Sequence, residues 1–191
     1  MKHEQFIDLV EANPVVAAVK DDAGLEKCIA SDIGVVFVLY GDIVSIPGIV
    51  SRLKAAGKTV LVHMDLITGL APKEVSVDFI HAKTSAAGII STRSNLIEHA
   101  ASLGMNTVLR YFMIDSIALR NVQRQSESKV QPDIVEILPA ILLPEFISKI
   151  KAITRVPLMA SGLVTTKKEV LNALNAGAVA VSTTDQRLWT A

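Results

Sequence analysis

The chain alternates short apolar runs of β-forming residues with stretches of helical periodicity along almost its whole length. The apolar runs cover residues 14–19, 34–40, 59–65, 88–91, 107–113, 133–138, 156–159 and 178–181. The first seven are each followed by apolar positions that recur every three or four residues, which indicates a helix. Because a crossover between parallel strands usually consists of a helix, this alternation predicts an α/β fold with a parallel sheet.

Eight apolar runs favour a compact, TIM-like (β/α)8 barrel that forms a single domain over residues 1–191. The final helix is expected to be reduced, since only residues 185–189 remain for it. An open, doubly wound sheet is the alternative that the same alternation allows. Its dinucleotide-binding form is disfavoured because no Gly-x-Gly-x-x-Gly turn follows an early strand. The sequence therefore predicts no cofactor.

The composition suits buried strands and sets a limit on nucleic-acid binding. Half of the residues are hydrophobic and only 4% are aromatic, so the strands are expected to be apolar on both faces. The formal net charge is zero. A protein that binds nucleic acid through broad neutralisation of phosphates is usually basic, so RNA binding would require a local patch.

The single cysteine and the N-terminal residues bear on where the protein acts. Cys28 alone cannot form an internal disulfide or a thiolate metal cage, and it is expected to be a buried thiol on a helix. The first residues show no apolar signal-peptide core, and no apolar run reaches the roughly 18–20 residues of a membrane span. These features predict a cytoplasmic protein with no membrane segment.

The last quarter of the chain carries the pattern of a phosphate site. It reads as a strand, a small-residue turn, a helix, a strand and a turn rich in hydroxyls. In a barrel both turns lie at the C-terminal edge of the sheet, where backbone N–H groups and a helix dipole favour an anion. The alternative is a pair of ordinary turns with capping hydroxyls. The predicted phosphate ligands are Gly162, Leu163, Ser182, Thr183 and Thr184.

Polar residues at or near the ends of other strands predict the remainder of a ligand-binding mouth. The candidates are Lys20, His63, Asp65, Arg110 and Glu136. Charged side chains in apolar strands are almost never buried unless they are paired, so an Arg110–Glu136 ion pair is a second interpretation that is compatible with the first. His63 is equally interpreted as a core histidine.

Other acidic residues near the predicted mouth have simpler explanations. Asp21, Asp42 and Asp115 precede helical patterns and suit helix caps or turns. A metal site formed by His63 with Asp65, Glu136 or Asp42 is weakly indicated, since the sequence has no paired-histidine motif. No metal site and no catalytic residue is therefore predicted.

One polar segment is the best candidate for contact with RNA. Arg120 and Arg124 are four residues apart and share a helix face, and Lys129 follows in the next loop. The alternative is a solvated helix face. Further basic patches are available at Lys149, Lys151 and Arg155 and at Lys167 and Lys168.

Several runs of the sequence together resemble one family. They read NPVVAAVKD (13–21), HMDLITGL (63–70), GIISTR (88–93), RYFMIDS (110–116), EILP (136–139) and SGLV (161–164) through AVSTT (180–184). In this order they resemble the glycerol uptake operon antiterminator regulatory protein family over essentially the whole chain. The chain departs from the expected pattern at Ser161, where glycine is expected, and at Arg93, where lysine is expected.

The resemblance implies a TIM-like barrel and a cytoplasmic regulator that is not an enzyme. It implies a protein that responds to glycerol 3-phosphate and acts on the leader mRNA of glycerol-utilisation genes to prevent premature termination. The alternative is a barrel enzyme that acts on a small phosphorylated sugar or triose, with Asp65 or Glu136 as general base. The reduced final helix would leave the barrel wall thinly covered, which is compatible with a homodimer.

Overall fold

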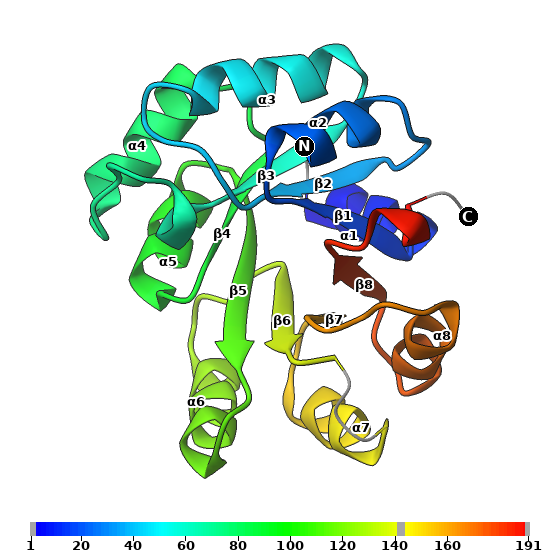
Figure 1. The fold of residues 1–191 in the computed structure, drawn as a ribbon. Coiled ribbons are helices and arrows are strands. Elements are labelled where there is room, and N and C mark those ends of the chain that lie inside the picture. The colour runs from blue at the N-terminus through cyan, green and yellow to red at the C-terminus, as the bar shows by residue number, and fades with distance from the viewer. Residues whose placement is uncertain (1–2, 141–143, 190–191) are drawn as a thin grey trace.

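Eight parallel strands close into a barrel in their order along the chain, so the barrel prediction is confirmed (Figure 1). The computed structural model describes residues 3–140 and 144–189. Each strand pairs with the next, and β1 also pairs with β8 to close the ring. The strands are β1 (Val15–Val19), β2 (Val35–Val38), β3 (Thr59–His63), β4 (Gly88–Ser91), β5 (Asn106–Phe112), β6 (Ile134–Leu138), β7 (Leu158–Ser161) and β8 (Ala180–Thr183).

Seven helices connect successive strands and surround the ring (Figure 1). They are α2 (Asp22–Ile29), α3 (Ile46–Ala55), α4 (Glu74–Lys83), α5 (Ser94–Ser102), α6 (Ser116–Glu127), α7 (Pro144–Ile153) and α8 (Lys167–Asn175). Two short 3₁₀ elements follow β3 and β8, and these are η1 (Met64–Leu66) and η2 (Gln186–Leu188). The expected reduction of the final helix is thus observed as η2. Among the described residues, no helix has both the length and the apolar character needed to cross a membrane.

Helix starts follow the capping chemistry that the sequence indicates. The Asp21 carboxylate accepts the Gly24 N–H at 2.7 Å, and the Asp115 carboxylate accepts two N–H groups in the first turn of α6. Thr166 and Glu169 form a capping box at the start of α8. These bonds satisfy N–H groups that have no partner within a helix. Asp21 and Asp115 are therefore helix caps, as the sequence suggests.

Alternation along the strands divides the core into an interior and a surrounding layer. One set of strand side chains fills the ring, including Val16, Phe37, Leu61 and Met159. The other set packs against the helices in two larger apolar clusters. Parallel strands buried on both faces require apolar residues at almost every position. In this chain those positions are filled mainly by aliphatic residues such as Val and Ile.

An N-terminal helix that the sequence analysis does not predict closes one end of the barrel. Helix α1 (His3–Ala12) precedes β1, and its Phe6 and Val10 are fully buried in the same cluster as the interior strand residues. Figure 1 shows α1 lying behind β1, against the ring of strands. Because α1 enters at the N-terminal ends of the strands, it leaves the opposite, C-terminal end as the mouth.

The last two strands begin two residues later than the sequence predicts. Pro157 lies before β7, where its carbonyl accepts the Val135 N–H, and the Ala178 N–H bonds back to the carbonyl of Ala173. Ala178 therefore completes the end of α8 and does not start β8. Both strands also end two residues later than predicted, so Ser161 and Ser182 are strand residues, paired in register, and do not belong to the turns that follow.

Helix α4 packs on the barrel through only one side of its apolar surface. Val75 is 64% exposed, while Ser76, Val77 and Ile80 are buried. The helix begins at Glu74, two residues after Pro72, and docks on the barrel through its Val77–Ile80 side. Docking selects one of two possible apolar stripes here, and sequence spacing alone does not distinguish them. The run Val77–Ile80 lies within this helix.

Candidate functional site

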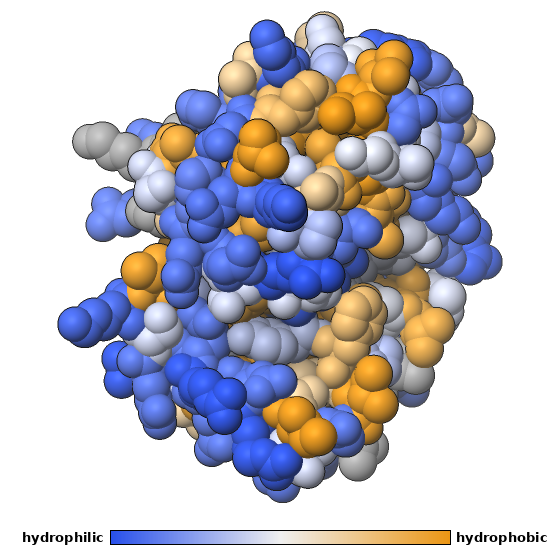
Figure 2. Space-filling model, turned by 90° about the vertical axis from the view of Figure 1, so that its left-hand side faces the viewer, coloured by the Kyte–Doolittle hydropathy of each residue, from blue (hydrophilic) through white to orange (hydrophobic). Residues whose placement is uncertain are grey.

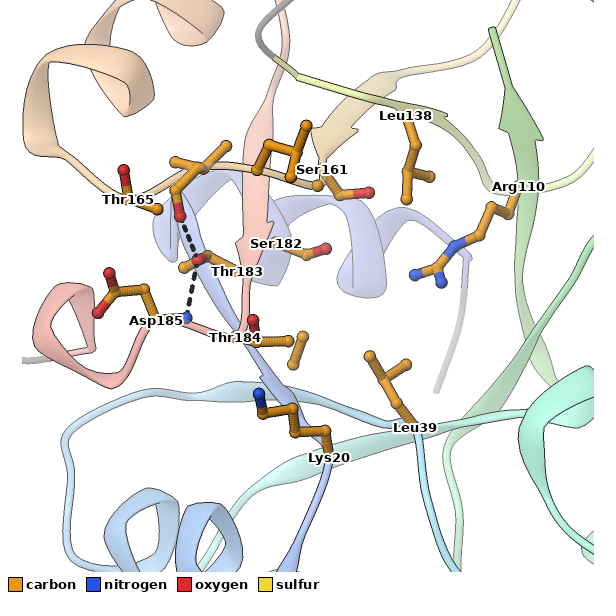
Figure 3. A pocket seen from close by; sticks show the side chains of 14 residues that line it. Lys20, Leu39, Arg110, Leu138, Ser161, Thr165, Ser182, Thr183, Thr184 and Asp185 are labelled. Atoms are coloured by element: carbon orange, nitrogen blue, oxygen red, sulfur yellow. Dashed lines mark hydrogen bonds between the residues drawn. The ribbon is translucent and has the colours of Figure 1, made fainter. Parts of the chain in front are cut away.

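A cavity of about 430 Å³ opens at the C-terminal mouth of the barrel, on the side formed by β5–β8 and β1 (Figure 3). Its size is at the lower end for small-molecule sites. All five predicted phosphate residues line it, together with two of the five predicted mouth residues. The lining residues are Ala18, Lys20, Leu39, Arg110, Leu138, Ser161, Gly162, Leu163, Val164, Thr165, Ser182, Thr183, Thr184 and Asp185.

Arg110 is held in this cavity by a buried carboxylate. Its Nε donates to Glu136 Oε2 at 2.6 Å, and Glu136 Oε1 accepts the Ser182 hydroxyl at 2.8 Å. Arg110 and Glu136 lie opposite each other on β5 and β6, and Glu136 is fully buried. The predicted ion pair is therefore present. It fixes the guanidinium through Nε, while the terminal nitrogens point into the cavity (Figure 3).

Three polar groups face the cavity without a hydrogen-bond partner among the described residues. The Ser161 Oγ is buried and unsatisfied. The terminal nitrogens of Arg110 and the Lys20 ammonium group also have none, and Figure 3 shows them directed into the cavity from different sides. An unsatisfied buried hydroxyl costs about 1–3 kcal/mol, so such groups indicate a site that a polar ligand completes.

The turn after β7 has an unusual backbone that shapes the cavity wall. Gly162 and Leu163 both have positive φ, at 80° and 61°. Leucine rarely adopts this conformation, which costs of the order of 1–3 kcal/mol and tends to occur at binding sites. A Cβ on Gly162 would lie 3.3 Å from the Leu138 side chain, so a larger residue would also crowd the wall. This turn therefore brings backbone close to the cavity.

The hydroxyl residues of β8 and its turn have different roles. The Thr183 hydroxyl donates to the Val164 carbonyl at 2.8 Å and accepts the Asp185 N–H at 3.0 Å (Figure 3). It thus ties the two turns of the predicted phosphate site together. Ser182 is bonded to Glu136, whereas Thr184 is exposed at the rim. Of these hydroxyls, that of Thr184, in the turn after β8, is therefore the most available to a ligand.

The charge of the cavity lining favours an anion. Lys20 and Arg110 are cationic, and the only carboxylate in the lining, among the described residues, is Asp185. Asp185 is paired with Arg187, whose Nε lies 2.9 Å from Oδ1, and this bond lowers the pKa of Asp185 to about 2. Arg187 therefore compensates the one negative charge, and an anionic group would meet a net positive wall.

His63 and Asp65, which the sequence places in the mouth, lie beside the cavity and do not line it. The Asp65 carboxylate accepts the Thr92 N–H at 2.7 Å and the Ser91 hydroxyl at 3.1 Å, and Arg93 Nε is 3.4 Å away. His63 is buried with its Nδ1 3.8 Å from Asp65 Oδ2. These residues connect β3 to the start of α5, and so they support the mouth from the side.

The buried His63 is expected to make the protein less stable in acid. Burial, followed by the charge of Arg110, lowers its pKa from 6.5 to about 4. Between these values the unfolded chain takes up the proton and the folded protein does not. Stability should therefore fall with decreasing pH in this window, by up to about 1.4 kcal/mol per pH unit, with no contribution above pH 6.5.

Urea denaturation of the wild type and of His63→Gln across pH 4–7 measures this effect. The variant should show a flatter dependence of the unfolding free energy on pH, because glutamine does not titrate. Parallel profiles for the two proteins would contradict a neutral buried histidine.

The predicted RNA patch lies away from the cavity. Arg120 and Arg124 are exposed on α6, and Lys129 is exposed just after it. Three cavity residues, Ser161, Val164 and Thr165, are not among the ligands that the sequence predicts. The position of Ser161 could have been predicted from strand alternation, because it is two residues after the inward-facing Met159 and so lies on the same face of β7.

Comparison with known proteins identifies the family. A family model described as glycerol-3-phosphate responsive antiterminator matches residues 15–189. The chain is 41% identical over 185 residues to the Escherichia coli protein YgcP, whose function is uncharacterized, covering 97% of this chain and 96% of that protein.

Two solved structures agree with the family model. A glycerol uptake operon antiterminator regulatory protein from Listeria monocytogenes superposes with a TM-score of 0.85 at 34% identity, covering 92% of this chain and 94% of that one. A glycerol uptake operon antiterminator-related protein from Thermotoga maritima superposes with a TM-score of 0.80 at 32% identity, covering 93% of this chain and 98% of that one. The chain therefore belongs to the glycerol-3-phosphate responsive antiterminator family.

Proposed function

We propose that the protein is a transcription antiterminator that binds glycerol 3-phosphate in the mouth cavity and acts on the leader mRNA of glycerol-utilisation genes. The observation that carries the ligand assignment is the set of unpartnered polar groups on Ser161, Arg110 and Lys20 beside the Gly162–Leu163 turn. The two cationic side chains and the backbone of the Gly162–Leu163 turn suit a phosphate group. The side-chain hydroxyls of the lining suit the hydroxyl groups of a glycerol moiety. A role on mRNA places the protein in the cytoplasm.

The positions of the two candidate general bases support a regulator over an enzyme. Glu136 is fully buried, and its two oxygens are occupied by Arg110 and Ser182. Asp65 is bonded to the start of α5 and does not line the cavity. A general base must come within hydrogen-bond reach of the substrate proton, and neither carboxylate is placed to do so. The cavity is thus suited to binding without turnover.

Filter binding of the leader RNA, with and without glycerol 3-phosphate, tests the proposed function. A regulator must bind its ligand differently in two states, so the affinity for RNA should change when the ligand is present. Equal RNA affinity in the two conditions would contradict the proposal. The oligomeric state in the same buffers should be measured as well, because the homodimer remains a prediction.

Replacing Lys20 with methionine should weaken the binding of glycerol 3-phosphate. A charge-assisted hydrogen bond contributes roughly 1.5–3 kcal/mol, so the Kd is expected to rise about 10- to 150-fold. Isothermal titration of the wild type with glycerol 3-phosphate and with glycerol measures the phosphate contribution directly. Lys83→Met, in the last turn of α4, is a matched control that should bind as the wild type does. Equal affinity for the two ligands would place the phosphate elsewhere.

A further inference from the structure

A second cavity lies outside the barrel, between α5 and α6, and is here named the α5–α6 groove. It has a volume of about 390 Å³ and is lined by residues of both helices, of β5 and of the turn before α5, among them Thr92, Glu98, Tyr111, Asn121 and Arg124. Figure 2 faces this side of the molecule and shows hydrophilic surface between hydrophobic patches above and below. Within the described part of the chain, the groove and the mouth cavity have no lining residue in common.

We infer that the α5–α6 groove binds a nucleotide of single-stranded RNA, an assignment that rests on the proposed function. Single-stranded RNA is recognised by side chains that hydrogen-bond to base edges and by arginine or aromatic groups that contact phosphates or bases. The groove offers these groups together, and its volume is within the range of small-ligand sites.

The groups that would contact RNA are available. Asn121 and Arg124 are exposed on α6, three residues apart, and make no hydrogen bond with the described residues. The Asn121 amide can both donate to and accept from a base edge, and the Arg124 guanidinium can bind a phosphate or lie against a base. Tyr111 lies at the inner side, where burial raises its pKa to about 12, so its hydroxyl stays a neutral donor.

The polar character of the groove distinguishes RNA from a protein partner. Apolar anchors dominate the centre of protein interfaces, whereas the helix residues that line this groove are mainly amides, hydroxyls and charges. Arg120 lies one turn before Arg124 and extends the positive surface along α6. Glu98 on α5 is the one carboxylate among the described lining residues, and it should oppose a phosphate. Removing its charge should therefore strengthen binding.

Two short series of neighbouring residues lead from the groove towards the proposed ligand site. Arg110 and Tyr111 are consecutive residues of β5, and their side chains lie on opposite faces of the strand, one in the mouth and one in the groove. Thr92, which lines the groove, donates its N–H to Asp65, and Asp65 adjoins His63. A ligand that shifts Arg110 would thus act on the β5 wall of the groove through the adjacent residue Tyr111, without any long-range path.

Filter binding with the leader transcript at saturating glycerol 3-phosphate tests the groove. Arg124→Gln and Asn121→Ala should each raise the Kd by about tenfold, a typical size for one lost contact of this kind. Arg124→Gln should also reduce the dependence of log K on log salt by about 0.7, whereas Glu98→Gln should lower the Kd. Lys27→Gln, in the last turn of α2, is the control that should leave the Kd unchanged.

The outcomes separate the inference from the proposed function. If wild-type protein binds the transcript and the three groove variants match it, the assignment of the groove is overturned while the regulator remains. If the wild type binds no RNA with or without glycerol 3-phosphate, the proposed function fails and the assignment fails with it. The groove substitutions are at exposed helix positions, and thermal melts should show that they leave the fold intact.

Discussion

The Arg110→Met variant is expected to lose about 3–5 kcal/mol of its free energy of unfolding. Removing one partner of a buried ion pair leaves the other charge without compensation, and that residual charge is the source of the loss. Here the remaining group would be Glu136, which is fully buried and 2.6 Å from the Arg110 Nε in the native protein. Ser182 alone would then satisfy the carboxylate.

Urea denaturation of three variants isolates this effect. Glu136→Gln and the double variant Arg110→Met/Glu136→Gln should be compared with Arg110→Met. The double variant should recover most of the lost stability, since its interior no longer holds an unpaired charge, and a glutamine can still accept the Ser182 hydroxyl. Its affinity for glycerol 3-phosphate should stay low, because the cavity has lost its guanidinium. A double variant as unstable as Arg110→Met would contradict the account.

The Gly88→Ala variant should be destabilised by more than about 3 kcal/mol. A Cβ at this position would lie 2.1 Å from the Asn106 carbonyl oxygen and 2.7 Å from its carbonyl carbon, which belong to the neighbouring strand. Ordinary overpacking costs 1–3 kcal/mol because side chains can shift. Two paired strands in a closed barrel cannot separate without losing ladder hydrogen bonds, so the cost here should exceed that range.

Gly48→Ala is the matched control for this prediction. Gly48 lies within α3, and a Cβ there has no heavy atom within 4 Å. Alanine is the better helix former, so this variant should gain about 0.5–1 kcal/mol. Thermal and urea unfolding of both proteins measure the two shifts. Changes of the same sign would show that glycine loss by itself, and not the contact at Gly88, sets the outcome.

Local patterns predict the eight strands and favour the barrel, because hydrophobic period and caps are properties of neighbouring residues, whereas closure of the sheet depends on the pairing of β1 with β8. The β4 bounds and the caps at Asp21 and Asp115 follow directly from such patterns. The start of β7 does not, since Val156 and Pro157 have strand-like neighbours but only tertiary pairing decides where the ladder begins. That two-residue shift turned Ser161 from a turn residue into an inward-facing one.

The sequence predicts the candidate site as polar residues at the ends of strands. In the structure the side chains of some of these residues point into the cavity and those of others point away from it. Lys20 and Arg110 line the cavity, whereas His63 lies beside it and Asp65 bonds to the start of α5. Sequence spacing places a residue at an edge but does not fix which way its side chain turns after the strand ends. Thr183 shows the same limit, since its hydroxyl joins two turns of the backbone.

The helix that closes the barrel floor has a consequence for how the chain folds during synthesis. Phe6 and Val10 are made first, yet the cluster that buries them includes Met159 and Ala180 from the last two strands. Sequence separation of this size slows folding, and the apolar face of α1 is not completely covered until nearly the whole chain has left the ribosome. Truncation of the nascent chain before β8 would thus leave the facing edges of β1 and β7 without a partner strand, and α1 without part of its apolar contact.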